Sequence, residues 1–133
     1  MTGERIAACA FVRRRGRDYV VLVTGRRYGE WLLPKGRSEP DLTRPQVAIL
    51  EAWEEAGVIG QVQGPPSRFR LDRHRGTARP VIAYCMNVQR LTRAWPEQHQ
   101  RQRRLVPLDH LHAIDLDPAW RRCIARMAGR RQR

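Results

Sequence analysis

The sequence has few acidic side chains, few cysteines and no long apolar run. Its 133 residues include 13 Asp and Glu against 26 Lys and Arg. No apolar segment approaches the ~20 residues that a membrane-spanning helix needs, and the N-terminal residues do not resemble a secretory signal. Three widely spaced cysteines without a C-x-x-C pair argue against a disulfide framework and against a zinc site. These absences predict a cytoplasmic protein with reduced thiols.

What the sequence does contain is enough apolar surface for one folded domain. Hydrophobic residues make up 41% of the chain, and a chain of this length buries roughly two-thirds of its unfolded surface. No internal repeat and no linker divides it. We therefore expect a single domain over residues 1–133, with no membrane partner, as a monomer or a homodimer.

Nearly all of the basic side chains are arginine, and the formal net charge is +13. The planar guanidinium pairs well with phosphate oxygens. This balance favours a polyanionic partner, such as a nucleic acid, a nucleotide or another phosphorylated small molecule. An arginine-rich composition that simply covers a solvated surface explains any single arginine about equally well. A cluster of acidic residues therefore stands out against this background.

The segment 31–60 has the clearest signals of local structure. It begins with a short apolar strand and a loop that contains glycine. Thr43 and Gln46 then have the spacing of a capping box. The pattern predicts a helix over Arg44–Ala56, which Gly57 ends.

Three glutamates lie close together on this helix. At ~100° per residue, Glu51, Glu54 and Glu55 share an arc roughly 100° wide. The residues expected to point away from them and pack on a sheet are Ile49, Ala52, Trp53 and Ala56. Carboxylates this close repel one another, and a hard cation such as Mg²⁺ would neutralise them. An acidic helix face that is simply solvated is the alternative explanation.

The rest of the chain alternates strand-like and loop-like segments. Strands are expected at residues 5–13, 19–24, 31–33, 58–62, 68–73, 79–88 and 103–107. The Gly-Pro-Pro at 64–66 is expected to break the strand that precedes it, and residues 37–42 to form a loop. An amphipathic helix is predicted at about 118–129. Strands that flank two helices predict an α/β sandwich around a mixed sheet.

Gly36 and the helix that follows it resemble the Nudix box. That signature is a Gly, five residues, a Glu, seven residues and then Arg-Glu-aliphatic-any-Glu-Glu-any-Gly-aliphatic. The spacing from Gly36 through Glu51 to Gly57 fits without an insertion, over residues 36–58. The resemblance implies a Nudix-type α/β/α sandwich around a mixed β-sheet.

Two positions of the box depart from the family pattern. Leu42 stands where the family has its first Glu, and Leu50 stands where it has the Arg before Glu51. In the family, that Arg mainly holds loop and helix together through ion pairs, and the first Glu is an accessory metal contact. We expect apolar packing to replace the Arg–Glu contact here. Because the three helix carboxylates are retained, the departure bears on the rate more than on the class of reaction.

Segments outside the box are similar to the branch of diphosphoinositol polyphosphate and diadenosine polyphosphate hydrolases. They are residues 5–11, 20–27, 31–34 and 95–97, followed by Arg101, Arg103 and Arg104. The implied reaction is Mg²⁺-dependent hydrolysis, by water attack at phosphorus, of a phosphoanhydride bond. The implied substrate is a nucleoside-diphosphate-linked or highly phosphorylated small molecule.

The resemblance also implies roles for individual residues. Glu51, Glu54 and Glu55 are expected to bind one to three Mg²⁺ ions, with the Gly36 carbonyl as a further ligand. Glu51 or Glu54 would orient or deprotonate the attacking water. Glu97 is the candidate for a late acidic ligand or base, although a polar loop commonly holds a stray Glu. Mn²⁺ is an alternative to Mg²⁺, because oxygen ligands suit both ions.

The predicted phosphate contacts are Arg5, Arg26, Arg27 and Lys35. Ordinary surface charge is the alternative explanation for each of them. Two other functions stay open. One is a catalytically weakened Nudix domain that binds nucleotides or RNA, and the other is an RNA 5′-pyrophosphohydrolase. Retention of all three glutamates favours the enzyme over the binding module, and nothing in the sequence selects RNA.

Overall fold

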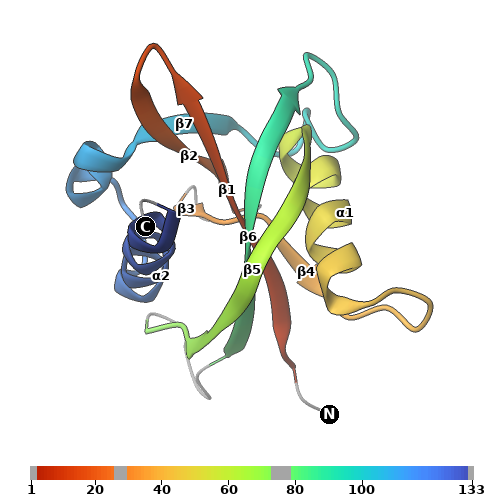
Figure 1. Cartoon of the computed structure of the whole chain (residues 1–133). Coiled ribbons are helices and arrows are strands. Elements are labelled where there is room, and N and C mark those ends of the chain that lie inside the picture. The colour runs from red at the N-terminus through yellow and green to blue at the C-terminus, as the bar shows by residue number, and fades with distance from the viewer. Residues whose placement is uncertain (1–2, 26–29, 73–78, 132–133) are drawn as a thin grey trace.

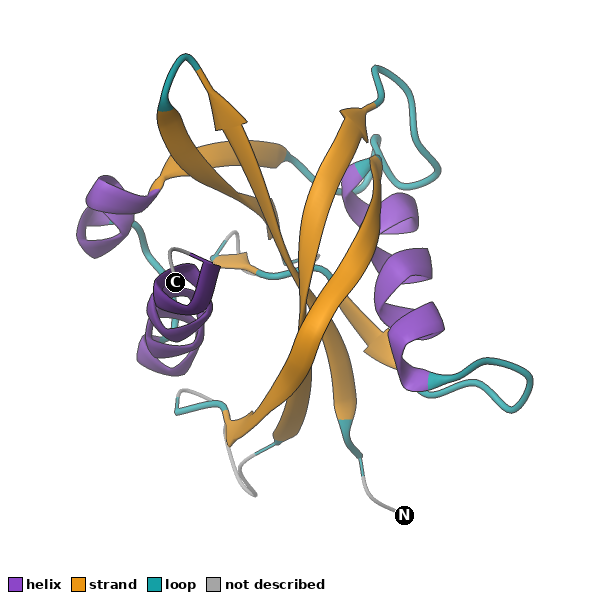
Figure 2. Cartoon of the chain, in the orientation of Figure 1, coloured by secondary structure: helices purple, strands orange, loops and turns teal. Residues whose placement is uncertain are grey.

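Two helices cover opposite faces of a mixed β-sheet (Figure 1), and Figure 2 shows the loops that connect the helices and strands. The computed structural model describes residues 3–25, 30–72 and 79–131. Within these ranges seven strands form the sheet, with α1 (Arg44–Ala56) on one face and α2 (Pro118–Arg131) on the other. The strands are β1 (Arg5–Arg14), β2 (Arg17–Thr24), β3 (Trp31–Leu32), β4 (Lys35–Arg37), β5 (Val58–Arg70), β6 (Pro80–Leu91) and β7 (Arg103–Pro107). The α/β class and the mixed sheet predicted from the sequence are confirmed.

A parallel pair, β1 and β6, forms the centre of the sheet. The two strands are in register from Arg5 opposite Val81 to Phe11 opposite Asn87. β5 pairs with the outer edge of β6, and β2 pairs with β1 only from Phe11 onward. The N-terminal half of β1, before Phe11, is therefore open to a different partner on the edge that β2 occupies further along the strand.

That partner is β4, which the sequence did not predict. Gly36 lies opposite Ile6, and Lys35 lies opposite Ala7. A segment of three residues is too short to show a strand periodicity, and pairing with β1 is what makes it extended. β4 places Lys35 and Gly36 beside β1, and α1 packs against both strands.

β5 corrects the expectation that residues 64–66 break a strand. A single strand runs through Val58–Arg70, and its register with β6 shifts between Gln63 and Ser67, where Gly64 has a φ of 74°. Proline lacks an N–H donor, but its fixed φ suits an extended chain. Because β5 is an edge strand, a missing donor is tolerated there. The Gly-Pro-Pro segment therefore forms a bulge.

The start and end of α1 agree with the sequence signals. The N–H of Gln46 donates to the Thr43 hydroxyl at 3.3 Å, and the N–H of Thr43 donates to the Gln46 side chain at 2.8 Å. Gly57 ends the helix with a φ of 65°, in the left-handed region that glycine adopts readily.

The face of α1 that packs on the sheet differs from the predicted one. The buried residues of this helix are Val47, Ala48, Ala52, Glu55 and Ala56. Trp53 is only half-buried and does not pack against the core. The expectation that packed residues and carboxylates occupy opposite sides was therefore wrong for Trp53 and Glu55. A hydrophobic pattern cannot reveal the polar partners that make a buried carboxylate tolerable.

α2 covers the other face of the sheet with its apolar side. Trp120, Ile124 and Met127 are buried, as the periodicity predicted, and the helix continues slightly past the expected end, to Arg131. The Trp120 ring meets the Phe69 ring edge-on, with 5.6 Å between centroids. No helix in the described ranges is both long and apolar enough to cross a membrane.

Candidate active site

Gly36 and Glu51 are in direct contact where β4 meets α1. A Cβ atom added to Gly36 would lie 2.6 Å from both carboxylate oxygens of Glu51. Any side chain at this position would displace the carboxylate, so the close approach requires glycine. Two positions that are distant in the box therefore meet in space.

Glu55 is a buried carboxylate with fixed partners. The residue is 3% exposed. Its Oε1 accepts from the backbone N–H of Lys35 at 3.3 Å, and its Oε2 lies 3.6 Å from Nη2 of Arg101. Burial raises the pKa of Glu55, and the Arg101 charge and the Lys35 N–H oppose that rise. These contacts hold the carboxylate against β4.

Glu51 is half-buried beside Glu55, and the two carboxyl groups are hydrogen-bonded to each other. Burial, followed by the negative charge of Glu55, raises the pKa of Glu51 to about 8, and Glu54 and Glu97 add to the rise. Burial and the neighbouring carboxylates together therefore disfavour the charged form of Glu51.

Glu97 lies next to Glu54. The backbone N–H of Glu97 donates to the Glu54 carbonyl at 2.9 Å, which ties the loop after β6 to the last turns of α1. Burial, and after it the charge of Glu97, raises the pKa of Glu54. The Glu97 carboxylate is paired with Nε of Arg101 at 2.9 Å. The acidic residues predicted from the sequence are thus neighbours in space.

The chemistry of these residues fits a hard divalent cation. Mg²⁺ takes oxygen ligands, and no Lys or Arg in the described part of the chain forms an ion pair with Glu51 or Glu54. The side chains do not converge on a common point, however. Across residues 3–25, 30–72 and 79–131, no three Asp, Glu, His or Cys side chains form a group that could hold a metal ion. Glu51 is directed at Glu55, and metal binding stays a prediction.

A cluster of cations lies beside the acidic residues. Burial lowers the pKa of the half-buried Lys35; Glu55 opposes this effect, and Arg5, Arg101 and Arg79 add to it. Burial, and after it the charge of neighbouring arginines, also lowers the pKa of Arg5. Cations that disfavour one another's charge in this way attract an anion.

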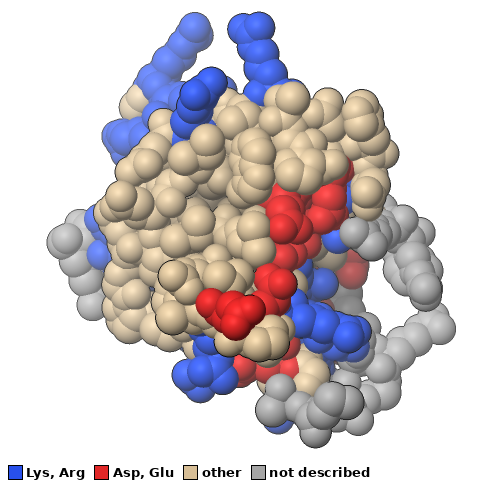
Figure 3. Space-filling model, turned by 90° about the vertical axis from the view of Figure 1, so that its right-hand side faces the viewer, with Lys and Arg blue, Asp and Glu red and all other residues tan. Residues whose placement is uncertain are grey.

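Acidic and basic side chains lie next to each other on the face that contains α1, as Figure 3 shows. Of the predicted phosphate contacts, Arg5 and Lys35 lie near the acidic cluster. Arg26 and Arg27 lie outside the described residues.

Arg101 connects the parts of the site, although the sequence did not single it out as a site residue. Its side chain is 12% exposed and pairs with both Glu55 and Glu97. Its Nη1 also donates to the Thr24 carbonyl at 3.0 Å. The i,i+4 spacing of Glu97 and Arg101 was a usable signal. The contact with Glu55 joins segments far apart in the chain and had none.

Trp95 and Arg103 anchor the same loop to the end of α1. The Trp95 indole N–H donates to the Glu55 carbonyl at 3.0 Å. Arg103 donates to the carbonyls of Ala56 and Thr92, each at 2.9 Å, and its guanidinium lies 4.2 Å from the centroid of the Trp95 ring. The bonds to the Glu55 and Ala56 carbonyls satisfy groups that the end of a helix leaves without partners.

Leu42 and Leu50, which depart from the family pattern of the box, do not pack in the way that was expected. Leu42 is 36% exposed in the loop before α1, and neither Leu42 nor Leu50 packs in or against the core. The expectation that apolar packing replaces the family's ion pair is therefore wrong for Leu42.

An open pocket of about 600 Å³ adjoins Arg101. Thr24 and Gln102 lie on one side of it. The backbone N–H of Thr24 donates to the Gln102 carbonyl at 3.1 Å, and the backbone N–H of Gln102 donates to the Thr24 hydroxyl at 3.0 Å. Trp31 and the polar side chains of residues 98–100 line the remainder. An aromatic ring with several polar groups suits a polar ligand that contains a ring.

Comparison with models of known protein families shows which family this chain matches. The model of the NUDIX domain matches residues 3–127. The chain belongs to the Nudix family. The match includes the box at residues 36–58, so the resemblance found in the sequence is confirmed.

Two curated relatives indicate the kinds of protein that this Nudix chain is similar to. Nudix hydrolase 18, mitochondrial, from Arabidopsis thaliana is 35% identical over 94 residues, which are 69% of this chain and 53% of that protein. Human diphosphoinositol polyphosphate phosphohydrolase 3-alpha is 32% identical over 98 residues, with 71% and 57% covered. The chain thus spans about half the length of these relatives.

Solved structures share the fold. The Ap4A hydrolase of C. elegans superposes with a TM-score of 0.68 at 16% identity, covering 86% of this chain and 87% of that one. The NUDIX domain of Shewanella oneidensis NrtR, solved with ADP ribose, gives 0.70 at 17% identity, covering 96% and 86%. Identities this low establish the fold alone, and it is the Nudix-type sandwich that was predicted.

Proposed function

We propose that this Nudix domain hydrolyses a phosphoanhydride bond in a nucleoside-diphosphate-linked or highly phosphorylated small molecule. The substrate would be of the diadenosine polyphosphate or diphosphoinositol polyphosphate type. The observation that supports this most is the acidic cluster at α1 with a cation cluster beside it. Adjacent clusters of opposite charge suit a metal–polyphosphate complex, because carboxylates bind the metal and cations bind the phosphates. The names of the human phosphohydrolase and the C. elegans hydrolase point to the same substrate classes.

The proposed metal ligands are the predicted ones: Gly36 through its carbonyl, Glu51, Glu54, Glu55 and Glu97. The ion would be Mg²⁺ or Mn²⁺. When bound, such an ion lowers the pKa of a water molecule and screens charge on phosphoryl oxygens. Glu51 or Glu54 orients the attacking water and accepts its proton.

Arg101 positions the acidic residues and does not itself react. It pairs with Glu55 and Glu97, which leaves Glu51 and Glu54 as the candidates to accept the proton. In the reaction, the water oxygen bonds to phosphorus while the bridging P–O bond breaks. Two phosphorylated products then leave.

The substrate would bind between the cation cluster and the pocket beside Arg101. Arg5 and Lys35 are the proposed phosphate contacts among the described residues, and Arg26 and Arg27 remain candidates from the sequence. The ring-bearing part of the substrate would enter the pocket lined by Trp31. A pocket with aromatic and amide side chains accepts such a group through stacking and hydrogen bonds.

A substrate panel tests the proposal. The purified protein is assayed with Mg²⁺ on diadenosine polyphosphates, diphosphoinositol phosphates, dinucleotides, nucleotide sugars, and capped or triphosphorylated RNA. We expect release of phosphate or mononucleotide from at least one small molecule. Turnover of RNA alone would support the RNA 5′-pyrophosphohydrolase instead. Binding without any turnover would support the nucleotide- or RNA-binding module.

Two variants test whether the activity depends on the assigned site. Glu55→Gln and Glu39→Gln each remove one carboxylate charge, but Glu39 is exposed in the loop before α1. We expect Glu55→Gln to lower kcat by roughly 100-fold and Glu39→Gln to leave it within about twofold. If Glu55→Gln keeps full activity, the site assignment is wrong even though the activity is real.

A further inference from the structure

The hairpin that joins β1 to β2 projects from the rest of the sheet (upper left in Figure 1). β6 pairs with β1 only as far as Phe11, and β7 pairs with β2 only as far as Tyr19. Beyond these residues β1 and β2 pair only with each other, up to Arg14 opposite Arg17. Among the described residues, the segment 12–18 is thus a two-stranded ribbon with no further strand on either edge.

Arginine makes up four of the five residues at the tip of this ribbon. Residues 13–17 are Arg-Arg-Arg-Gly-Arg, and all of them are exposed. Arg14 lies directly opposite Arg17, and like charges in that position destabilise a strand pair. Because successive side chains of a strand point to opposite faces, Arg13 and Arg14 place cations on both faces of the ribbon.

Arg14 and Arg15 have no counter-charge. Among the described residues, their side chains form no hydrogen bond and no ion pair. Burial, and after it the charge of Arg14, lowers the pKa of Arg103, so Arg14 faces another cation. Arg13 and Arg17 are paired with aspartates at 3.1 Å and 3.0 Å, and exposed pairs of this kind are weak. An anion would therefore meet at least two uncompensated guanidiniums at the tip.

The backbone at Arg15 is unfavourable for a long side chain. The φ of Arg15 is 51° and that of Gly16 is 75°, which are the positive values of a type I′ hairpin turn. Asn-Gly and Asp-Gly are the preferred sequences for this turn, because bulky side chains are strained at positive φ. The described contacts give no structural reason for an arginine at this position, and such strain is concentrated at functional sites.

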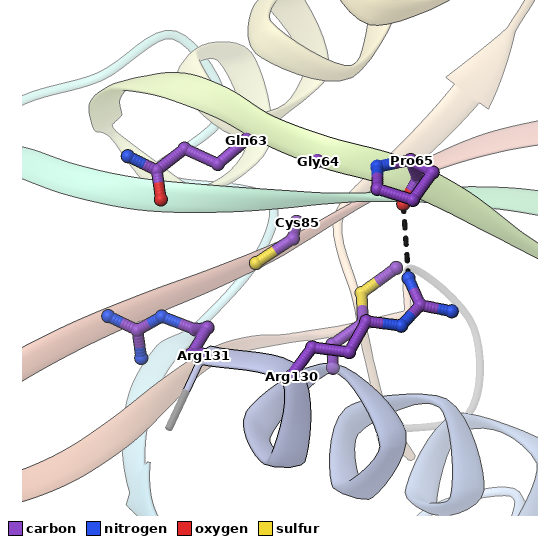
Figure 4. Close-up of a pocket in the computed structure, with 7 residues that line it drawn as sticks. Gln63, Gly64, Pro65, Cys85, Arg130 and Arg131 are labelled. Atoms are coloured by element: carbon purple, nitrogen blue, oxygen red, sulfur yellow. Dashed lines mark hydrogen bonds between the residues drawn. The ribbon is translucent and has the colours of Figure 1, made fainter. Parts of the chain in front are cut away.

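The arginines at the end of α2 do not form a comparable cluster. Arg130 donates to the Pro65 carbonyl at 3.2 Å. Figure 4 shows the Arg130 and Arg131 guanidiniums directed to opposite ends of a cavity of about 390 Å³. A single anion there would meet one guanidinium at a time, whereas residues 13–17 carry their guanidiniums on one turn.

We propose that the ribbon of residues 12–18 enters the major groove of double-stranded DNA, where its arginines contact phosphates on both sides of the groove. This groove is ~12 Å wide and ~8.5 Å deep and admits a two-stranded β-ribbon. The four residues from Val12 to Arg15 span roughly 13 Å at ~3.3 Å per residue, which is enough to enter it. Guanidinium groups pair well with phosphate oxygens, and cations on both faces of the ribbon match phosphates on both sides of the groove.

A groove fits this ribbon better than a flat anionic surface does. A membrane would meet only one face of the ribbon, and residues 13–17 include no apolar side chain that could insert between lipids. The major groove of A-form RNA is too narrow to admit the ribbon. Contacts with phosphates do not read the bases, so we expect binding that is independent of DNA sequence. The ribbon contains none of the proposed active-site residues, and its role does not depend on hydrolysis.

Fluorescence anisotropy with a short labelled DNA duplex of random sequence tests the proposal. The logarithm of the association constant should fall with the logarithm of salt concentration, with a slope of about −3 or steeper for three or more neutralised phosphates. The double variant Arg14→Gln/Arg15→Gln should reduce the slope by about two and weaken binding roughly tenfold or more at ~50 mM salt. The matched control Arg68→Gln/Arg122→Gln removes the same charge at exposed positions of β5 and α2. It should change the dissociation constant by less than about threefold.

The variant Arg15→Asn separates binding from folding. Because asparagine suits the positive φ, the Tm should rise by roughly 2–4 °C, while the affinity for DNA falls about threefold or more. Duplex RNA, phosphatidylcholine vesicles that contain phosphatidylserine, and poly-L-glutamate are titrated in parallel and should bind more weakly than DNA. The proposal is overturned by an absence of DNA binding, by equal weakening in both double variants, by full affinity in Arg15→Asn, or by tighter binding of any of these three partners.

Discussion

Replacing Glu51 by glutamine tests whether the acidic cluster contains uncompensated charge. Burial and the charge of Glu55 raise the pKa of Glu51 to about 8, and Glu54 and Glu97 contribute. In metal-free protein the folded state therefore binds this proton more tightly than the unfolded chain does. The free energy of unfolding consequently falls as the pH rises from 4.5, the ordinary value, to about 8. Glutamine resembles the neutral carboxyl group, so Glu51→Gln should stabilise metal-free protein at pH 8.

The size of the effect follows from the pKa. A tenfold difference in proton affinity corresponds to about 1.4 kcal/mol, so a rise from 4.5 to about 8 corresponds to roughly 4–5 kcal/mol at full strength. Glu51 is only half-buried, and water screens part of the repulsion. We therefore expect a gain of about 2 kcal/mol in the free energy of unfolding at pH 8. At pH 5, where the carboxyl group is mostly protonated, the gain should be a few tenths of that value.

Urea denaturation in the presence of EDTA, at pH 5 and at pH 8, measures this difference. Thermal unfolding should show it as a rise of roughly 5–10 °C in the Tm of Glu51→Gln at pH 8. The exposed control Glu39→Gln should show no comparable gain. If Glu51→Gln is as stable as the unaltered protein at pH 8, or less stable, the reasoning about the acidic cluster is refuted.

Three further predictions concern the same site. Gly36→Ala should lower kcat/KM by roughly 100-fold, because its Cβ would displace the Glu51 carboxylate; a near-normal value would contradict the close contact. Arg101→Met should lower the free energy of unfolding at pH 7 by roughly 3–5 kcal/mol, because it leaves the buried Glu55 without its charged partner. Urea denaturation measures this loss, and a change below about 1 kcal/mol would argue against the ion pairs. EDTA should abolish hydrolysis, and Mg²⁺ or Mn²⁺ should restore it; activity that persists in EDTA would exclude a required divalent ion.

Local signals predicted the local structure around the site well. Thr43 and Gln46 form the capping box that their spacing indicated, and Gly57 ends α1 with the positive φ that glycine favours. Such features depend on residues three or four apart, so a single stretch of sequence contains all the information.

Predictions failed where a partner distant in sequence decided the outcome. Residues 35–37 become a strand because β1 is open to them, and β5 continues beyond the Gly-Pro-Pro at 64–66 because β6 pairs with the residues on both sides of it. Trp53 looked like a core residue, yet the helix is rotated so that Glu55 lies on the packed side instead. In each case, contacts with residues that are distant in the sequence determine the strand pairing or the rotation of the helix.

The sequence by itself determined the family, the layered α/β fold and the position of the acidic helix, because all three are set by periodicity, caps and motif spacing. Only the tertiary structure decided the environment of the carboxylates. It brings Arg101 and the loop of Glu97 to α1, buries Glu55 against β4 and leaves Glu51 among negative charges. Burial and charge are sums over every neighbour in space, and most of these neighbours are far apart in the chain.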